Sequence, residues 1–173
     1  SKGCAELITK AYLRSFFTAE KYGKDHKIGL ASARAGNVIG GGDWNKDRLI
    51  PDCIRGFINN EPVVIRYPKA VRPWQYVLEP LHGYLLLAKK LYTEGPVFSG
   101  PWNFGPEKKS EKPVQWIVEK DHELWGNSLP WKLNPVKQPH ESTLLRLDSK
   151  KAKTLLGWHP RISLSLALKE TVD

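Results

Sequence analysis

The sequence contains no methionine and only two cysteines among its 173 residues. Because a natural chain begins at an initiator methionine, we expect this one to continue a longer sequence upstream of Ser1. Two thiols, Cys4 and Cys53, are too few for a disulfide framework or a four-thiolate zinc site. We expect both to be buried free thiols, the usual state of such cysteines in cytosolic proteins.

Long apolar runs are missing as well, since no stretch approaches the ~20 residues needed to cross a bilayer. The first ten residues, SKGCAELITK, are charged and amphipathic, unlike a secretory signal. The composition of 40% hydrophobic and 26% charged residues is ordinary for a soluble globular protein. We therefore expect a cytoplasmic protein that has no membrane partner.

The chain has a net charge of +9 and a pI of about 9.5. Such a balance suits phosphate-bearing partners, either nucleic acid or a nucleotide-linked small molecule. The densest basic clusters, 108–109 and 150–153, contain no interleaved aromatic residues and are typical of solvated surfaces. We therefore expect no nucleic-acid partner. A steep salt dependence of DNA or RNA affinity would contradict this expectation.

Helical periodicity alternates with short apolar runs, which predicts an α/β fold without internal repeats. Helices are expected over 1–22, 49–59, 79–91, 113–125, 148–157 and from 164 onward. Strands are expected over 28–33, 63–66, 74–77, 102–104 and 144–147. Asp148 and Ser163 fit as caps at helix starts, and Gly126 and Gly157 fit as helix ends.

The G-x-G-x-x-G turn of a dinucleotide-binding site is missing from this sequence. The glycines at 40–42 have a different spacing, and no helix follows them directly. If a dinucleotide is used, we expect most of its site to lie outside this chain. Likewise, no His, Cys, Asp and Glu residues stand at metal-ligand spacing.

Five segments in this order resemble the C-terminal half of the extended short-chain dehydrogenase/reductase family: SKGCAE, ARAGNVIGGGDW with DRLIPD, VRPWQYVLEPLHGYL, WNFGP and LGWHP. GGGDW and RPWQYV point, within the family, to the nucleotide-sugar 4,6-dehydratases that act on CDP-glucose. Most nucleotide-sugar relatives have a Tyr-Gly-Pro turn and Arg-Asp-Trp at these places. The resemblance implies that 1–36 end a Rossmann-type NAD-binding domain. It implies that 37–173 form mainly a small α/β nucleotide-sugar-binding domain, with segments returning to the Rossmann sheet.

The resemblance also implies a reaction. NAD takes a hydride from C4 of the glucose, the 4-keto group acidifies the C5 proton, water leaves from C6, and the hydride returns to C6 to give CDP-4-keto-6-deoxyglucose. Such enzymes are homodimers or higher homo-oligomers and supply deoxysugars for lipopolysaccharide O-antigen. Because the catalytic tyrosine and the acid/base residues would lie upstream of Ser1, we expect residues 1–173 alone to be inactive, poorly soluble or associated.

On the cofactor side, the resemblance implies that Lys2 ends a Y-x-x-x-K pattern. Its charge would favour a tyrosinate base, and its ammonium would bind the nicotinamide ribose. By spacing alone, Lys2 is an exposed lysine near a terminus. Arg34 and Gly36 follow the strand 28–33, at the end of a strand where α/β sheets bind ligands, and are implied to contact the cofactor.

On the substrate side, the resemblance implies a set of residues that hold the phosphates and the base. These are Asn37, Arg48, Leu49, Val64, Arg66, Arg72, Asn103, Lys137 and His140. Arg72 would grip the diphosphate, because a guanidinium binds phosphate oxygens in pairs, and we expect it to affect binding rather than folding. Structural interpretations remain open: Asn37 could fix a turn, and His140 could be a surface histidine.

The tryptophans divide into two groups. Trp116, Trp125 and Trp158 are expected in the core, whereas Trp44 and Trp74 lie in matched motifs and are expected near the site. Two alternative functions stay open: another NAD-dependent epimerase or dehydratase that uses UDP or GDP sugars, and a non-catalytic nucleotide-sugar-binding domain.

Overall fold

The computed structural model describes residues 2–126, 129–136 and 140–173. The chain forms two compact units. Unit 1 comprises 1–35, 78–104 and 148–160, and unit 2 comprises 36–77, 105–147 and 161–173. Both units combine helices with strands, so the predicted α/β class is confirmed. No helix in the described part of the chain is long and apolar enough to cross a bilayer.

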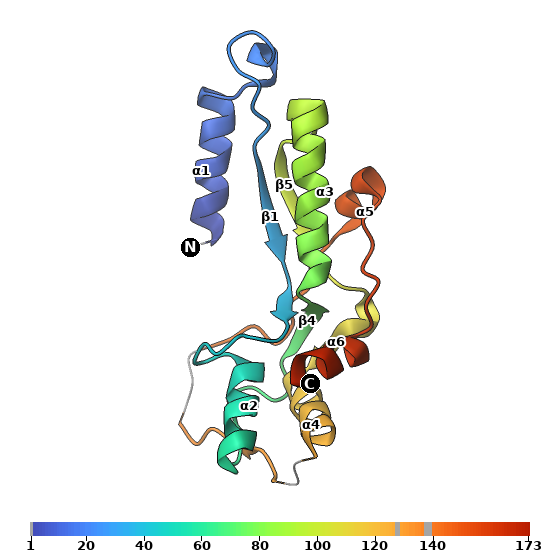
Figure 1. Cartoon of the computed structure of the whole chain (residues 1–173). Coiled ribbons are helices and arrows are strands. Elements are labelled where there is room, and N and C mark those ends of the chain that lie inside the picture. The colour runs from blue at the N-terminus through green and yellow to red at the C-terminus, as the bar shows by residue number, and fades with distance from the viewer. Residues whose placement is uncertain (1, 127–128, 137–139) are drawn as a thin grey trace. The chain divides into compact units, whose positions relative to one another are not determined.

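Unit 1 is built on two parallel strands, β1 (Ala31–Ala35) and β5 (Gly100–Phe104), with Ala31 opposite Gly100. Figure 1 shows α1 (Lys2–Ser15) and α3 (Leu78–Glu94) alongside this strand pair, and α5 (Lys150–Leu156) near α3. Two short 3-10 helices complete the unit: η1 (Ala19–Lys21) and η2 (Gly95–Phe98). Parallel strands need a crossover, and α3 supplies it here.

The core of unit 1 is aromatic. Trp102, Phe104 and Trp158 are fully buried, and the rings of Phe104 and Trp158 meet edge to face at 5.2 Å. The indole of Trp158 donates to the carbonyl of Glu79 at 3.0 Å, which fixes the chain after α5 on the first turn of α3. A Cβ at Gly83 would clash with the Phe104 ring, so α3 can approach β5 this closely only with glycine there.

Unit 2 contains a three-stranded sheet in the order β2 (Asn37–Ile39), β4 (Val71–Tyr76), β6 (Glu111–Pro113). The central strand β4 is parallel to β2 and antiparallel to β6. Two shorter strands, β3 (Val64–Ile65) and β7 (Lys132–Leu133), pair in parallel. The helices are α2 (Leu49–Asn59), α4 (Val114–Trp125) and α6 (Leu164–Val172), with the 3-10 turn η3 (Lys108–Ser110).

Two apolar clusters hold unit 2 together. One gathers Ile39, Ile50, Trp74, Ile117, Leu164, Ala167 and Leu168, which joins the sheet to α4 and α6. The other gathers Cys53, Phe57, Val63, Ile65 and Val118, which joins β3 to α2 and α4. Leu49 and Ile54 on α2 and Val114 on α4 pack against both clusters, so these helices link the two parts of the core.

Several local predictions are confirmed. The helix 49–59 has the predicted bounds, and α4 and α5 end at Gly126 and Gly157, both with positive φ. Ser163 caps α6, and its Oγ accepts from the Leu166 amide at 3.2 Å. The start of α5 differs slightly from the prediction. Ser149 is its N-cap residue, while the side chain of Asp148 accepts from the Lys150 amide at 2.8 Å.

The predicted helix 1–22 is too long. The amides of Phe16 and Phe17 both donate to the Tyr12 carbonyl, at 2.9 and 3.2 Å, and the helix stops at Ser15. Phe17 then packs edge-on against the ring of His26, with centroids 5.6 Å apart. The helix therefore ends about two turns earlier than periodicity suggests.

The strand predictions were wrong in places. The first strand begins at Ala31 rather than at 28, and residues 144–147 contribute only an isolated bridge between Leu144 and Val71. The strands β2, β6 and β7 were not predicted. Each has two or three residues, so each is too short to show an alternating pattern and is defined by its pairing.

Burial corrects two expectations about side chains. Cys53 is buried but Cys4 is exposed, because α1 buries none of its described residues within unit 1. Trp158 is a core residue and Trp116 is partly buried, whereas Trp125 is 39% exposed at the end of α4.

Candidate functional site

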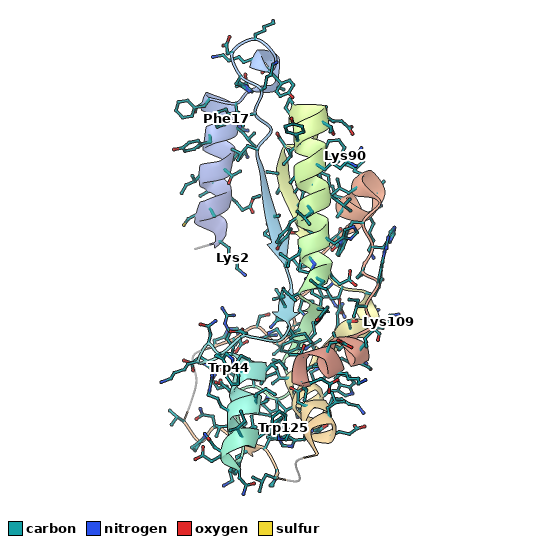
Figure 2. All side chains as sticks on the ribbon, viewed as in Figure 1. Lys2, Phe17, Trp44, Lys90, Lys109 and Trp125 are labelled. Carbon is teal, nitrogen blue, oxygen red and sulfur yellow. The ribbon has the colours of Figure 1, made fainter. Side chains whose placement is uncertain are left out.

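In unit 1, Glu6 joins α1 to β1. Its two carboxylate oxygens accept from the hydroxyl of Ser32 at 2.9 and 2.8 Å, and one of them lies 3.4 Å from Nε of Arg34. Lys2 precedes Glu6 by four residues, about one helical turn, so the two residues share a face of α1. Figure 2 shows Lys2 at the N-terminal end of α1, beside the carboxyl end of β1. The predicted cofactor residue therefore lies where α/β sheets bind ligands.

Arg34 and Asn103 are direct partners in the register of β1 and β5. The side-chain amide of Asn103 donates to the carbonyl of Asp148 at 3.1 Å, which fixes the start of the α5 segment. Its Oδ1 is buried and accepts no hydrogen bond from the described residues. A buried acceptor without a donor is costly, so this oxygen marks a place where a ligand or water donor fits. Lys2, Arg34 and Asn103 thus belong to one unit.

The remaining described candidates belong to unit 2. Asn37 pairs with Trp74 where β2 joins β4, and Trp74 donates its indole N–H to the Lys112 carbonyl at 3.0 Å. Trp74 is therefore a core residue between strands and not an open site residue. A Cβ at Gly36 would clash with the Pro73 carbonyl, which gives Gly36 a packing reason of its own. Its predicted contact with the cofactor stays a prediction.

The loop 43–47, called the braced loop below, precedes α2 and is held by several hydrogen bonds. Arg55 on α2 donates to the carbonyls of Trp44 and Asn45, at 2.8 and 3.2 Å, and pairs with Asp52. Asp43 accepts from the backbone and side-chain nitrogens of Asn45, at 3.0 and 2.7 Å. The Asn45 amide, together with nearby Arg48 and Arg55, lowers the pKa of the Asp43 carboxyl.

The same loop brings two predicted binding residues near each other. Asp47 lies 3.6 Å from the guanidinium of Arg66, at the end of β3. Arg48 is the N-cap residue of α2 and is exposed, while Leu49 packs into the core. Trp44 stays 59% exposed although its backbone is held, and Figure 2 shows it near the start of α2. Exposed arginines and an exposed indole on a fixed loop are suited to a phosphorylated, aromatic ligand.

Val64 is also exposed, opposite Lys132 of β7 in the register of the small sheet. No local pattern in the sequence singles out Lys132. It lies 68 residues away in sequence, so only the strand pairing shows that it neighbours Val64.

Arg72 differs from its expected state. Its side chain is 7% exposed, its Nη1 donates to the Val71 carbonyl at 2.9 Å, and its Nη2 is paired with the carboxylate of Glu141. Arg72 is therefore part of the packing of β4 as well as a binding candidate. His140 is exposed, and Lys137 lies outside the described residues. The motif that indicates His140 as a binding residue does not indicate its neighbour Glu141.

One strongly perturbed group lies apart from these candidates. Asp121 on α4 is fully buried, and neither of its carboxylate oxygens has a hydrogen-bond partner among the described residues. Burial raises the pKa of Asp121 to about 8. Nearby, burial raises the pKa of the Cys53 thiol well above its ordinary value. The described residues contain no group of three His, Cys, Asp or Glu side chains able to hold a metal ion.

Comparison with known proteins gives a clear result. No family model matches the chain. It is 55% identical over 172 residues, 99% of its length, to CDP-glucose 4,6-dehydratase of Salmonella typhimurium, and it spans only 48% of that protein.

Solved structures share the fold. UDP-glucuronic acid 4-epimerase of Bacillus cereus, in complex with UDP-glucuronic acid and NAD, matches with a TM-score of 0.78 at 20% identity, over 96% of this chain and 48% of the other. dTDP-glucose 4,6-dehydratase of Bacillus anthracis, in complex with NAD, matches with a TM-score of 0.71 at 18% identity, over 97% and 48%. Over nearly its whole length the chain is therefore similar to about half of a CDP-glucose 4,6-dehydratase, and it shares the fold of the two solved nucleotide-sugar enzymes.

Proposed function

We propose that this chain is the C-terminal part of an NAD-dependent lyase that converts CDP-glucose to CDP-4-keto-6-deoxyglucose. The observation that carries the proposal is the sequence identity to the Salmonella typhimurium dehydratase, which extends through both units. In this proposal, unit 1 carries Lys2 and Arg34 for NAD, and unit 2 carries most of the residues for the sugar nucleotide. The complete protein is a homodimer or a higher homo-oligomer.

The residues of unit 1 suit a dinucleotide. Bound NAD would accept a hydride from C4 of the sugar and return it to C6. The ammonium of Lys2, on the face of α1 that carries Glu6, has three N–H donors for ribose hydroxyls. Its positive charge favours the anionic form of a neighbouring phenol, which would allow a tyrosine to act as a base near neutral pH. Asn103 also lies in unit 1, but the family resemblance assigns it to the substrate, from which its buried Oδ1 can accept a hydrogen bond.

The residues of unit 2 suit a nucleoside diphosphate. Arg72 offers a guanidinium held in one plane, which matches phosphate oxygens. Arg48 and Arg66 are exposed beside the braced loop, and Val64 offers an apolar surface on β3 for a base. The proposal assigns Asn37, Lys137 and His140 to the phosphates and Leu49 to the base, as the family resemblance implies.

The decisive experiment uses a half-exchange enzyme, in which residues 1–173 replace the matching half of the Salmonella typhimurium protein. With CDP-glucose deuterated at C4, we expect a product lighter by one water, with the deuterium at C6 by NMR. UDP-glucose and GDP-mannose should give little product. Purified enzyme that carries NAD would support the cofactor assignment.

Two alternatives predict different outcomes. An epimerase would return the hydride to C4, so the product would keep the mass of the substrate and the deuterium at C4. A module that only binds nucleotide sugars would show a thermal shift with CDP but no product. Either result would overturn the dehydratase assignment. A thermal-shift series with CDP, UDP and GDP would then identify the preferred base.

A further inference from the structure

The segment that carries Glu141 is fastened to β4. The amide of Val71 donates to the Thr143 carbonyl at 2.8 Å, and the amide of Leu145 donates to the Val71 carbonyl at 3.2 Å. Leu144 forms a bridge with Val71 between these two bonds. Backbone pairing therefore places Glu141 next to Arg72 and does not leave it on a free loop.

The contact itself joins a buried group to a half-exposed one. Arg72 keeps 7% of its side-chain surface exposed, whereas Glu141 keeps 50%. Among the described residues, Glu141 supplies the one carboxylate within ion-pair distance of Arg72. Because a buried charge is costly without a partner, Arg72 depends on Glu141 more than Glu141 depends on Arg72.

The geometry fixes the plane of the guanidinium. Nη1 is bound to the Val71 carbonyl and Nη2 to Glu141, so two acceptors hold the two ends of the group. A guanidinium has five N–H donors in a rigid fork, and these two contacts use two of them. A plane that is fixed before the ligand arrives loses less side-chain entropy on binding.

We propose that Glu141 is a positioning residue: it holds Arg72 in the orientation in which its other N–H groups bind the diphosphate of the substrate. The proposal rests on the proposed function, because it needs a nucleoside diphosphate as ligand. It differs from a purely structural role, in which Glu141 only neutralises a buried charge and the affinity for phosphates is independent of it.

The test compares a ligand that has a diphosphate with one that lacks it. In the half-exchange enzyme, Glu141→Gln keeps the size of the side chain but removes its charge. We expect CDP to bind about tenfold more weakly, while cytidine binds within about twofold of the unmodified protein. KM for CDP-glucose should rise by a similar factor, with little change in kcat. Glu141→Asp retains the charge and should recover most of the CDP affinity.

Glu123→Gln is the matched control, since Glu123 forms an exposed ion pair with Lys120 on α4. This variant should change neither the affinity for CDP nor the affinity for cytidine. Equal weakening of CDP and cytidine, or a lower melting temperature with unchanged CDP affinity, would show that Glu141 is only structural and would overturn the proposal. Failure of the proposed function would look different, because the unmodified half-exchange enzyme would then neither bind CDP nor form a keto sugar.

Discussion

The carboxylate of Glu6 on α1 accepts hydrogen bonds from the hydroxyl of Ser32 on β1, with both oxygens within 2.9 Å of Oγ. Arg34 approaches the same carboxylate from two residues further along the strand. One acidic side chain thus sets how α1 lies on the strand pair of unit 1. Since Lys2 shares its helix face, we expect the position of the Lys2 ammonium to depend on this contact.

We expect Lys2→Ala in the half-exchange enzyme to lower turnover about a hundredfold or more, the range of acid–base helpers. The NAD content of the purified protein should fall as well, because ribose contacts are lost. Steady-state kinetics and absorbance after denaturation measure the two effects. Lys10→Ala is the control, because Lys10 is an exposed lysine on the same helix. It should change neither the turnover nor the NAD content. Near-normal turnover in the Lys2 variant would remove Lys2 from the mechanism.

We expect Ser32→Ala to act on Lys2 through Glu6. Without the hydroxyl, one end of the contact between α1 and β1 is lost, at a cost of about 1 kcal/mol in unfolding free energy. Turnover should fall several-fold more than this small loss of stability explains. Urea denaturation and kinetics measure the two quantities. A variant that loses stability but keeps full turnover would show that the contact does not position Lys2.

Arg72 requires a revised expectation. Because it is buried and paired, Arg72→Ala should lower the unfolding free energy by about 1–2 kcal/mol as well as weaken CDP binding. The cost stays below that of breaking a fully buried pair, since the Glu141 left behind is half exposed to water. Urea denaturation followed by tryptophan fluorescence measures it. Lys120→Ala is the control, because Lys120 forms an exposed ion pair with Glu123 on α4, and its effect should be smaller.

The sequence predicted best what is encoded locally. The helix 49–59 and the ends at Gly126 and Gly157 were found because apolar spacing and a glycine with positive φ act within a few residues. The family resemblance supplied the candidate residues for the site. The burial and the hydrogen bonds of these residues depend on partners that are far away in the sequence, and no local pattern contains this information.

Two contacts illustrate this limit. Arg72 meets Glu141 from 69 residues away, and Asn103 meets the carbonyl of Asp148 from 45 residues away. Each partner residue can be seen in the sequence. The two residues of each pair come together only because the folded chain brings a later segment alongside β4 or β5. The burial of Arg72, and hence its effect on stability, follows from that pairing.

Asp121 predicts how stability depends on pH. Its pKa is about 8 in the folded chain against 3.8 for the ordinary side chain, so the folded state holds a proton that the unfolded state has released. Stability from this group is therefore complete below pH 3.8 and is lost as pH rises towards about 8. Within that window, each pH unit costs at most about 1.4 kcal/mol.

Labelling of the buried Cys53 thiol, which packs in the same part of unit 2, reports the opening of this core. Mass spectrometry of the Cys53 peptide gives the labelling rate of the thiol in the folded chain. Divided by the labelling rate of the chain unfolded in urea at the same pH, this rate should show that the core opens more easily at pH 8 than at pH 5.5. Asp121→Asn removes the titration and should flatten this dependence. An equal slope in the variant would mean that Asp121 stays ionised in the fold.

The last prediction concerns the apolar face of α1. Leu7, Ile8, Tyr12 and Phe16 are between 50% and 70% exposed, and the rings of Tyr12 and Phe16 lie tilted against each other with centroids 5.4 Å apart. Monomers seldom expose a continuous apolar patch of more than about 300–600 Å². We therefore expect the isolated 173-residue chain to associate, with a mass by light scattering above 19.7 kDa.

The double variant Leu7→Lys, Ile8→Lys should shift the chain towards the monomer. Both side chains already face water, and a charge at these positions opposes their burial between associated chains. Leu133→Lys is the control: Leu133 is just as exposed, but it lies on β7 in unit 2, and this change should leave the mass as it was. A monodisperse monomer for the unmodified chain, with sharp near-ultraviolet tryptophan signals, would show that the apolar face of α1 is tolerated in water and that residues 1–173 fold independently.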